Sequence, residues 1–164
     1  MAQARRKKGH DKKLTHQVSR GLREGALLIL GTLAIYLLVS LASYFPGDPG
    51  WSHAGTGAEI NNAGGVVGAW IADVLFYLFG YLAYLLPVMV AYSGWLIYRG
   101  RTPSGDIDLH VLAVRWSGFL LTVGAGCGLD TLESGPGAGY LPAGAGGVLG
   151  TVIGNGLADR CSPV

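Results

Sequence analysis

The residue types that most often perform chemistry are sparse in this 164-residue chain. Its four histidines and two cysteines show no C-x-x-C or H-E-x-x-H spacing, patterns that are typical of metal sites. All lysines lie in the first 13 residues, whereas a P-loop needs a lysine directly after its glycine-rich turn. No serine, histidine and acid have a plausible arrangement for nucleophilic catalysis. We therefore predict no catalytic residue, no metal site and no cofactor.

Two acids at the borders of apolar segments are further candidates for chemistry. Glu24 precedes the first apolar segment, and Asp73 lies early in the second. Acids inside a membrane can form proton relays, but both positions fall where a membrane surface is expected, Glu24 on the inner side and Asp73 on the outer side. We therefore favour solvation or local pairing for both acids. Cys127 and Cys161 either pair or remain thiols, and a buried thiol is the simpler interpretation.

The composition explains why reactive groups are scarce. Half of the residues are hydrophobic and 13% are charged, against about 25% charged residues in soluble domains. So few polar residues leave too little polar surface to cover a soluble domain of this size. An ordinary soluble enzyme, a disordered chain and a disulfide-rich secreted module are excluded. The fold class predicted is a small, all-α integral membrane protein.

Three apolar segments are long enough to cross a bilayer, which takes about 20 residues in a helix. The first ends at Tyr44 and Phe45 without the small-residue cleavage site of a signal peptide, so we interpret it as an uncleaved span. The third contains Arg115, whose long side chain can reach the headgroups. A fourth stretch, over 147–158, is too short to cross, and we expect an interfacial or re-entrant helix there.

The second apolar segment is longer than a bilayer requires. A helix from Val66 to Tyr98 would have 33 residues and a length of about 50 Å. We expect this helix to tilt, to kink at Pro87, or to place its first two turns among the outer headgroups.

Basic residues set the orientation of the spans. Eight lysines and arginines lie in the first 23 residues and none lies in the first loop, while Arg99 and Arg101 follow the second span. Because cytoplasmic flanks carry the excess of basic residues, the N-terminus is predicted to be cytoplasmic and the C-terminus external. The orienting residues of the tail are Arg5, Arg6, Lys7, Lys8, Lys12 and Lys13. The predicted segments are a basic tail (1–23), a first span (24–45), a periplasmic loop (46–65), a long second span (66–98), a cytoplasmic loop (99–108), a third span (109–129) and a Gly/Pro-rich periplasmic segment with a short helix (130–164).

The basic tail and the glycines suggest partners. We expect the tail mainly to set topology, with anionic lipid as the next interpretation and nucleic acid as the last, because no aromatic residue interleaves the basic run. Glycines recur at four-residue spacing near Gly64, Gly124 and Gly146, which lets a second helix backbone approach closely. We therefore expect tight helix packing within the chain or between copies, a lipid bilayer as partner, and no direct binding of nucleic acid.

Two strings around the first external loop resemble those of a known family. The segments 45–52 and 62–73 read FPGDPGWS and NAGGVVGAWIAD. With the basic leader and the end of the second span at Arg99, they resemble the N-terminal four-transmembrane domain of the bacterial FtsK/SpoIIIE family of DNA translocases. The residues that carry the motifs and their packing are Pro46, Asp48, Pro49, Trp51, Gly64, Gly65, Gly68, Trp70 and Asp73.

Physical chemistry gives these motif residues structural roles. Pro46 and Pro49 bracket Asp48 in a rigid turn that stops the first helix. Trp51 and Trp70 carry amphipathic rings that suit the outer headgroup level. The glycines of the second string leave room for close packing where the second helix begins.

The resemblance implies a membrane anchor. In this family the domain holds a cytoplasmic hexameric motor at the division septum of the inner membrane and contacts other divisome membrane proteins. The motor uses ATP to move chromosomal DNA through the closing septum during chromosome partition. We expect this chain to be truncated, because family members continue into a further span, a linker and the motor. The alternative is an independent small membrane protein, such as a transport subunit or accessory protein, which would need polar groups inside the bundle near mid-bilayer.

Overall fold

The computed structural model describes the backbone of residues 2–55, 59–99, 109–134 and 140–161. These residues form helices and no strand, so the predicted all-α class is confirmed. In chain order the elements are α1 (Ala2–Ala42), α2 (Gly65–Phe79), the 3₁₀ helix η1 (Gly80–Tyr84), α3 (Leu85–Arg99), α4 (Leu109–Ser134) and α5 (Gly147–Cys161).

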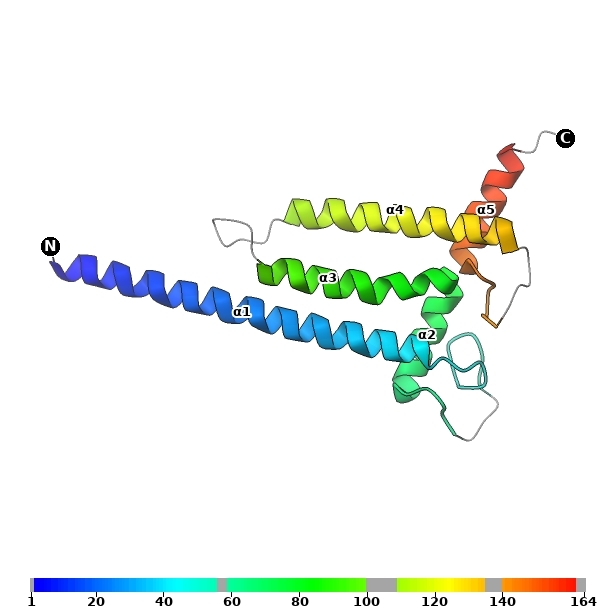
Figure 1. Ribbon diagram of the computed structural model, residues 1–164, viewed down its shortest axis with the longest axis horizontal. Helices are drawn as coiled ribbons and strands as arrows, with labels where there is room; N and C mark the ends of the chain where they lie inside the picture. Colours follow the sequence, from blue (N-terminus) through cyan, green and yellow to red (C-terminus); the bar gives the residue numbers. More distant parts are fainter. Residues whose placement is uncertain (1, 56–58, 100–108, 135–139, 162–164) are drawn as a thin grey trace.

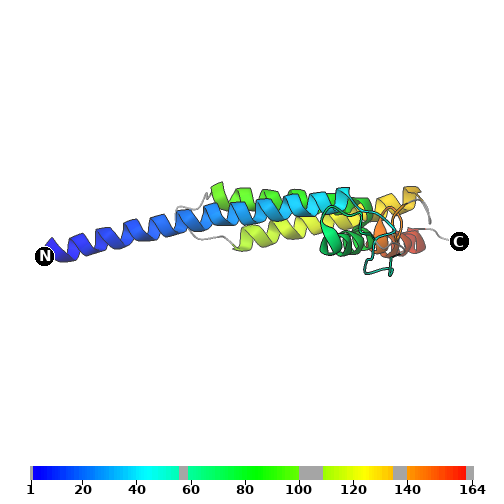
Figure 2. The ribbon, with the colours of Figure 1, turned by 90° about the horizontal axis from the view of Figure 1, so that it is seen from below.

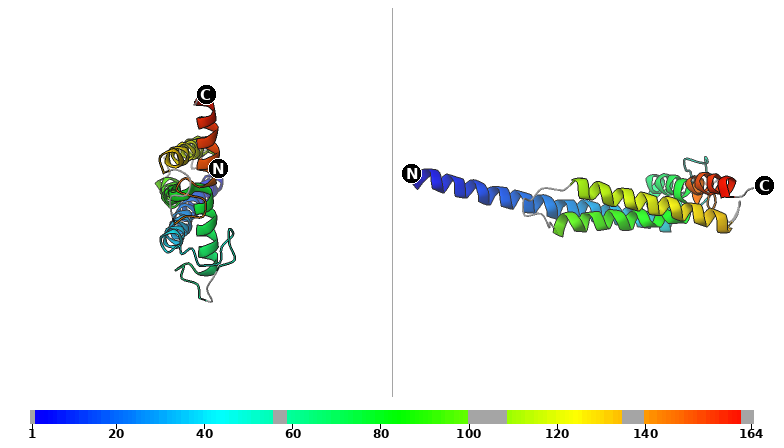
Figure 3. Two further views of the ribbon diagram at one scale, coloured as in Figure 1. Left: turned by 90° about the vertical axis from the view of Figure 1, so that its right-hand side faces the viewer. Right: turned by 90° about the horizontal axis from the view of Figure 1, so that it is seen from above.

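Three helices share one direction and two helices cross their end. α1, α3 and α4 run roughly alongside one another, with α3 packed against α1 and α4 packed mainly against α5 (Figure 1). α2 and α5 run across this direction and extend to opposite sides (Figure 1 and Figure 3). We call the end of the bundle that holds α2, α5 and residues 43–55 and 59–64 the loop end, and the opposite end the N-terminal end.

Three stretches of the described residues are long and apolar enough to cross a membrane, which confirms the predicted number. They are Arg20–Ala42, Gly65–Arg99 and Leu109–Glu133. α1 begins at Ala2, so the backbone of the basic tail continues the helix of the first span. Figure 2 shows this part of α1 projecting beyond α3 and α4. The short α5 has 15 residues, as expected for a helix that does not cross.

The second stretch is divided, in contrast to the single helix expected over 66–98. Gly80 ends α2 with φ +57° and ψ −141°, a conformation that is essentially restricted to glycine. The N–H of Tyr81 donates to the carbonyl of Ala145 (2.9 Å), and a Cβ on Gly80 would overlap that carbonyl. Pro87, the expected kink, lies in the first turn of α3, where its missing N–H is tolerated. The chain therefore turns at Gly80, and α2 runs across the direction of α3 (Figure 1).

α2 and α5 begin with the same local structure. The pattern Gly-Gly-Val-x-Gly opens both helices, at 64–68 and at 146–150. The second glycine of each has a positive φ, +66° at Gly65 and +64° at Gly147, which favours glycine. The first turns of both helices contain equivalent backbone hydrogen bonds. In α2, Gly65 N donates to Asn62 O (2.9 Å) and Gly68 N to Gly64 O (3.1 Å). In α5, Gly147 N donates to Gly144 O (3.2 Å) and Gly150 N to Gly146 O (3.0 Å).

The best-buried apolar cluster lies at the loop end. The rings of Tyr44 and Tyr84 meet Phe76 edge-on, with centroids 5.0 and 5.6 Å away. The Tyr84 hydroxyl also donates to the carbonyl of Leu41 (3.1 Å). The end of α1, the middle of α2 and η1 are thus held together by one cluster, whose buried members are Leu41, Ala72, Phe76 and Ala83.

Candidate functional site

The most elaborate polar structure of the described residues surrounds two acids at the loop end. Asp48 and Asp73 are 3% and 1% exposed, although buried acids are uncommon unless they are paired or hydrogen-bonded. Neither forms a salt bridge with lysine or arginine in the described part of the chain. Both are satisfied by N–H and O–H donors instead, and these donors fix the shape of the loop.

Asp48 closes the loop on itself. Its N–H donates to the carbonyl of Phe45 (3.1 Å), which makes a tight turn between Pro46 and Pro49. Its carboxylate accepts the backbone N–H groups of Asn61 (2.9 Å) and Asn62 (2.8 Å). The predicted turn after the first helix is present. From this turn the Asp48 carboxylate binds the backbone of Asn61 and Asn62, at the other end of the loop.

Asp73 fastens the loop to α2. Its carboxylate accepts the N–H of Ser52 (2.6 Å), the hydroxyl of Ser52 (2.9 Å) and, more weakly, the hydroxyl of Tyr44 (3.4 Å). Gly50 passes so close that a Cβ at this position would lie 2.6 Å from the carboxylate. The loop backbone therefore lies directly on Asp73, and the local pairing favoured for this acid is what the structure contains.

Ser52, His53 and Asp73 meet here, an arrangement that the sequence analysis did not identify. The Ser52 hydroxyl lies 2.9 Å from Nδ1 of His53 and 2.9 Å from the Asp73 carboxylate, so the serine is placed between the acid and the imidazole. A nucleophilic triad needs the imidazole between the serine and the acid. Nδ1 of His53 is 3.7 Å from Asp73, and its Nε2 is buried without a partner in the described structure. Because Ser52 lies between His53 and Asp73, the acid does not orient the imidazole toward the serine as it does in a triad. The arrangement therefore supports a structural hydrogen-bond network.

The buried acid also acts on the neighbouring tyrosine. Partial burial, followed by the charge of Asp73 and the hydrogen bond to it, raises the pKa of Tyr44 to about 12. A phenolate next to a buried carboxylate would place two negative charges together, so the hydroxyl keeps its proton and continues to donate.

Asn62 joins the loop to α1, and its role was not found from the sequence. Its side-chain amide donates to the carbonyl of Ser40 (2.8 Å), and its amide oxygen accepts the N–H of Gly64 (2.8 Å). The hydroxyl of Tyr36 donates to the carbonyl of Gly64 (3.0 Å). Side-chain Cβ atoms at Gly64 or Gly68 would meet the Ser40 hydroxyl, so these glycines allow α2 to rest on α1.

The other glycine patterns also meet helices of the same chain. Cβ atoms at Gly146 and Gly150 would overlap the side chain of Thr131 and the carbonyl of Cys127 in α4. On the opposing helix, Gly128 lies under Ile153 of α5. The glycine patterns therefore support tight helix packing within the chain.

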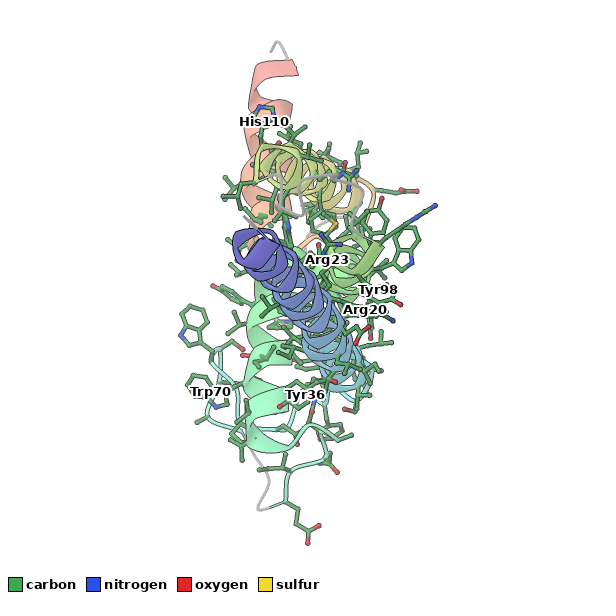
Figure 4. The ribbon with its side chains drawn as sticks, turned by 90° about the vertical axis from the view of Figure 1, so that its left-hand side faces the viewer. Arg20, Arg23, Tyr36, Trp70, Tyr98 and His110 are labelled. Atoms are coloured by element: carbon green, nitrogen blue, oxygen red, sulfur yellow. The ribbon has the colours of Figure 1, made fainter. Side chains whose placement is uncertain are left out.

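The two tryptophans of the motif lie on the surface of the loop end. Trp51 is 59% exposed, and its ring meets Tyr77 edge-on at 5.4 Å. Trp70 is 45% exposed and projects outward from α2 (Figure 4). A shallow cleft of about 420 Å³ lies at this end between the first loop and residues 140–142. Its lining residues are Tyr44, Phe45, Pro46, Gly47, His53, Tyr140, Leu141 and Pro142.

The described residues that were predicted to set the topology lie at the N-terminal end. Arg99 lies over the ring of Trp95 at 5.0 Å, and Arg101 lies outside the described residues. Glu24 pairs with Arg20 (2.9 Å) on the exposed surface of α1, so its local pairing is also present. Figure 4 views this end and shows Arg20 near Tyr98 of α3. The basic residues at 5–13 belong to the helical backbone of α1.

No disulfide is present among the side chains that the structure describes. Cys127 is buried and free, and its thiol donates to the carbonyl of Phe79 (3.3 Å). The side chain of Cys161 lies outside the described residues. Among the side chains that the structure describes, no three of the types His, Cys, Asp and Glu are grouped so that they could hold a metal ion.

Comparisons with known proteins point to one family. A profile for the 4TM region of DNA translocase FtsK/SpoIIIE matches residues 19–162. The chain is 43% identical over 136 residues to a DNA translocase FtsK of Shewanella oneidensis, which covers 83% of this chain and 15% of that protein. It is 39% identical over 145 residues to a DNA translocase FtsK of Pseudomonas syringae pv. tomato, covering 88% and 18%. A relative from Vibrio vulnificus with the same name is 42% identical over 127 residues, covering 77% and 13%.

These matches concern a small part of the relatives. The chain spans less than a fifth of the length of the three proteins named above. The matched range includes the whole of all three stretches that could cross a membrane. It also includes both sequence motifs, at 45–52 and 62–73. No solved structure matches the chain significantly.

Proposed function

The chain belongs to the family of the 4TM region of DNA translocase FtsK/SpoIIIE, and from this membership we propose that it anchors a DNA translocase at the division septum. As a member, it is the membrane-anchoring part of such a translocase and a multi-pass protein of the inner membrane. The observation that carries the proposal is the match over residues 19–162. This range contains the three spans and the two sequence motifs, 45–52 and 62–73, that include Asp48 and Asp73.

ATP hydrolysis and DNA movement are assigned in this proposal to a motor outside these residues. The matched region is the membrane domain and not the ATPase motor. No lysine follows position 13, so the chain itself offers no P-loop lysine for nucleotide phosphates. The chain's share of the activity is then to hold the motor at the membrane.

The proposed orientation places the N-terminal end in the cytoplasm and the loop end outside. It is supported by the eight basic residues among the first 23 and by Arg99 at the same end of the bundle. The loop end, with its fixed loop and the nearby cleft, would then face the space in which periplasmic segments of other division proteins lie. We propose that this end contacts membrane proteins of the divisome and that copies of the domain self-associate.

A localisation experiment tests the proposal. A fluorescent protein fused to the N-terminus of the full chain should collect at midcell in dividing bacteria. The control is an unrelated three-span protein with the same fusion and expression level, which should label the whole cell periphery. Overproduction of the chain should also delay septation, because it would compete with the full-length translocase for the same partners. Uniform peripheral fluorescence of the chain in cells that divide normally would overturn the assignment to the septum.

A further inference from the structure

The direction of α2 relative to the spans has a consequence for the membrane. α1, α3 and α4 share one direction, and α2 lies across it at the loop end, as the two perpendicular views show (Figure 1 and Figure 3). Membrane-spanning helices are tilted by about 20° on average from the bilayer normal. A helix that lies across this shared direction at one end of the bundle therefore runs along the membrane surface.

The length of the second apolar stretch agrees with this placement. η1 and α3 together have 20 residues, from Gly80 to Arg99. At about 1.5 Å per residue, such a length matches the roughly 30 Å hydrocarbon core. The 15 residues of α2 are therefore not needed to cross the bilayer. The turn at Gly80 separates a spanning part from a part that is left at the surface.

The exposed face of α2 carries apolar side chains and no charge. Val66, Val67 and Trp70 are 50%, 62% and 45% exposed. The sole charged residue between Gly65 and Phe79 is Asp73, which is buried under the loop. A helix that faced water would carry charged or polar groups on its exposed side.

The remaining faces of α2 are occupied within the chain. Asp73 is covered by Ser52 of the loop, and Gly68 rests against Ser40 of α1. α2 is therefore fixed in its crossing position with its apolar face outward. Tryptophan is enriched at the headgroup level of membranes because its ring is apolar and its N–H is polar. Trp51 of the loop also lies beside α2, where its ring contacts Tyr77.

We propose that α2 is a membrane-surface helix whose exposed strip, Val66, Val67 and Trp70, contacts lipid at the boundary between headgroups and acyl chains. Helices that lie in the membrane interface bury their apolar face about 5–10 Å into that boundary. The lipid holds the loop end at one depth, while the spans carry the chain across.

Two matched sets of spin labels test this placement in the full chain reconstituted into liposomes. Labels are attached to single cysteines at 67, 70 or 74 in α2, and at 85, 88 or 92 in α3, after Cys127→Ser and Cys161→Ser. The two sets have identical spacing, and the labelled residues are Val67, Trp70, Val74, Leu85, Val88 and Tyr92. Collision with oxygen and with a water-soluble nickel chelate reports the depth of each label.

The α2 labels should have nearly the same depth, at headgroup level. The α3 labels should differ by about 10 Å from first to last, because seven residues of a spanning helix rise by that distance. A depth that changes along α2 as steeply as along α3 would show that α2 crosses the bilayer, and would overturn the proposal. Strong nickel collision without oxygen collision at all three α2 positions would place the strip in water and overturn it as well. Neither result bears on the proposed septal localisation, which the fluorescent fusion tests separately.

Discussion

The backbone N–H of Ser52 donates to the Asp73 carboxylate across 2.6 Å, which ties the first loop to the middle of α2 through a buried acid. The second buried acid, Asp48, ties the same loop to its own far end through Asn61 and Asn62. Hydrogen bonds to a charged acceptor are shorter and stronger than those between neutral groups. The loop end is therefore a fixed surface and not a loose connection between spans.

Asp73→Asn should loosen the loop. The amide removes the charge that strengthens the two bonds from Ser52, and such bonds contribute about 1.5–3 kcal/mol each. We expect a loss of about 2 kcal/mol in the free energy of unfolding and faster protease cleavage between Gly50 and Ala54. The matched control is Glu59→Gln, which neutralises an exposed acid of the same loop. Equal stability of the two variants in detergent unfolding would show that Asp73 does not hold the loop.

Gly64→Leu with Gly68→Leu should separate α2 from α1. Both side chains would meet the Ser40 hydroxyl, and overpacking of this kind costs about 1–3 kcal/mol. The chain offers a matched control in Gly21→Leu with Gly25→Leu, where glycines of the same spacing have no atom within 4 Å of their Cβ positions. Thermal unfolding in detergent should show a lower midpoint for the first pair only. Crosslinking of both pairs then measures self-association, and a larger effect at Gly21 and Gly25 would place a subunit contact on α1.

Gly80→Ala should disturb the turn between α2 and η1. The alanine Cβ would overlap the Ala145 carbonyl, and the φ of +57° is itself unfavourable for alanine. Gly65→Ala separates the two effects, because Gly65 has a φ of +66° and no atom within 4 Å of its Cβ position. We expect a loss of roughly 1–2 kcal/mol for Gly65→Ala and a clearly larger loss for Gly80→Ala. A smaller effect at Gly80, measured by the same unfolding assay, would mean that the contact with Ala145 is not formed.

High pH should weaken the loop end through Tyr44. Its pKa is raised to about 12 in the folded chain from an ordinary value of 10.0, so the folded state holds the proton more tightly. The stabilisation is complete below pH 10 and is lost as the pH rises toward about 12. Phenolate absorbance should show a late titration step that is absent in Tyr44→Phe. In Asp73→Asn the late step should move to lower pH, and an unchanged step would remove Asp73 as a cause.

The sequence predicted the membrane class and the number of spans because apolar length is a strong and local signal. It also predicted a turn at Pro46 and Pro49 around Asp48, and it favoured solvation or local pairing for Asp73. The break at Gly80 was missed, since the positive φ and the bond from Tyr81 to Ala145 depend on a segment 64 residues further along the chain. Pro87 was a misleading signal because a proline in the first turn of a helix does not bend it.

The packing of the site depended on contacts that no single segment contains. Asn62 and Ser40 had no recognisable pattern, because their roles arise only when the loop folds back onto α1. One available signal was overlooked: the string Gly-Gly-Val-x-Gly occurs at 64–68 and again at 146–150. Its repetition would have predicted that α5 begins as α2 does.

The orientation of the anchor is the central claim, and accessibility of single cysteines tests it most directly. Ala54 is exposed at the loop end and Tyr98 is 48% exposed at the N-terminal end. After Cys127→Ser and Cys161→Ser, Ala54→Cys should react in intact cells with a thiol reagent that does not pass the inner membrane. Tyr98→Cys should react with the same reagent only after the membrane is permeabilised. Labelling of Tyr98→Cys but not of Ala54→Cys in intact cells would contradict the account, because it would place the loop end in the cytoplasm.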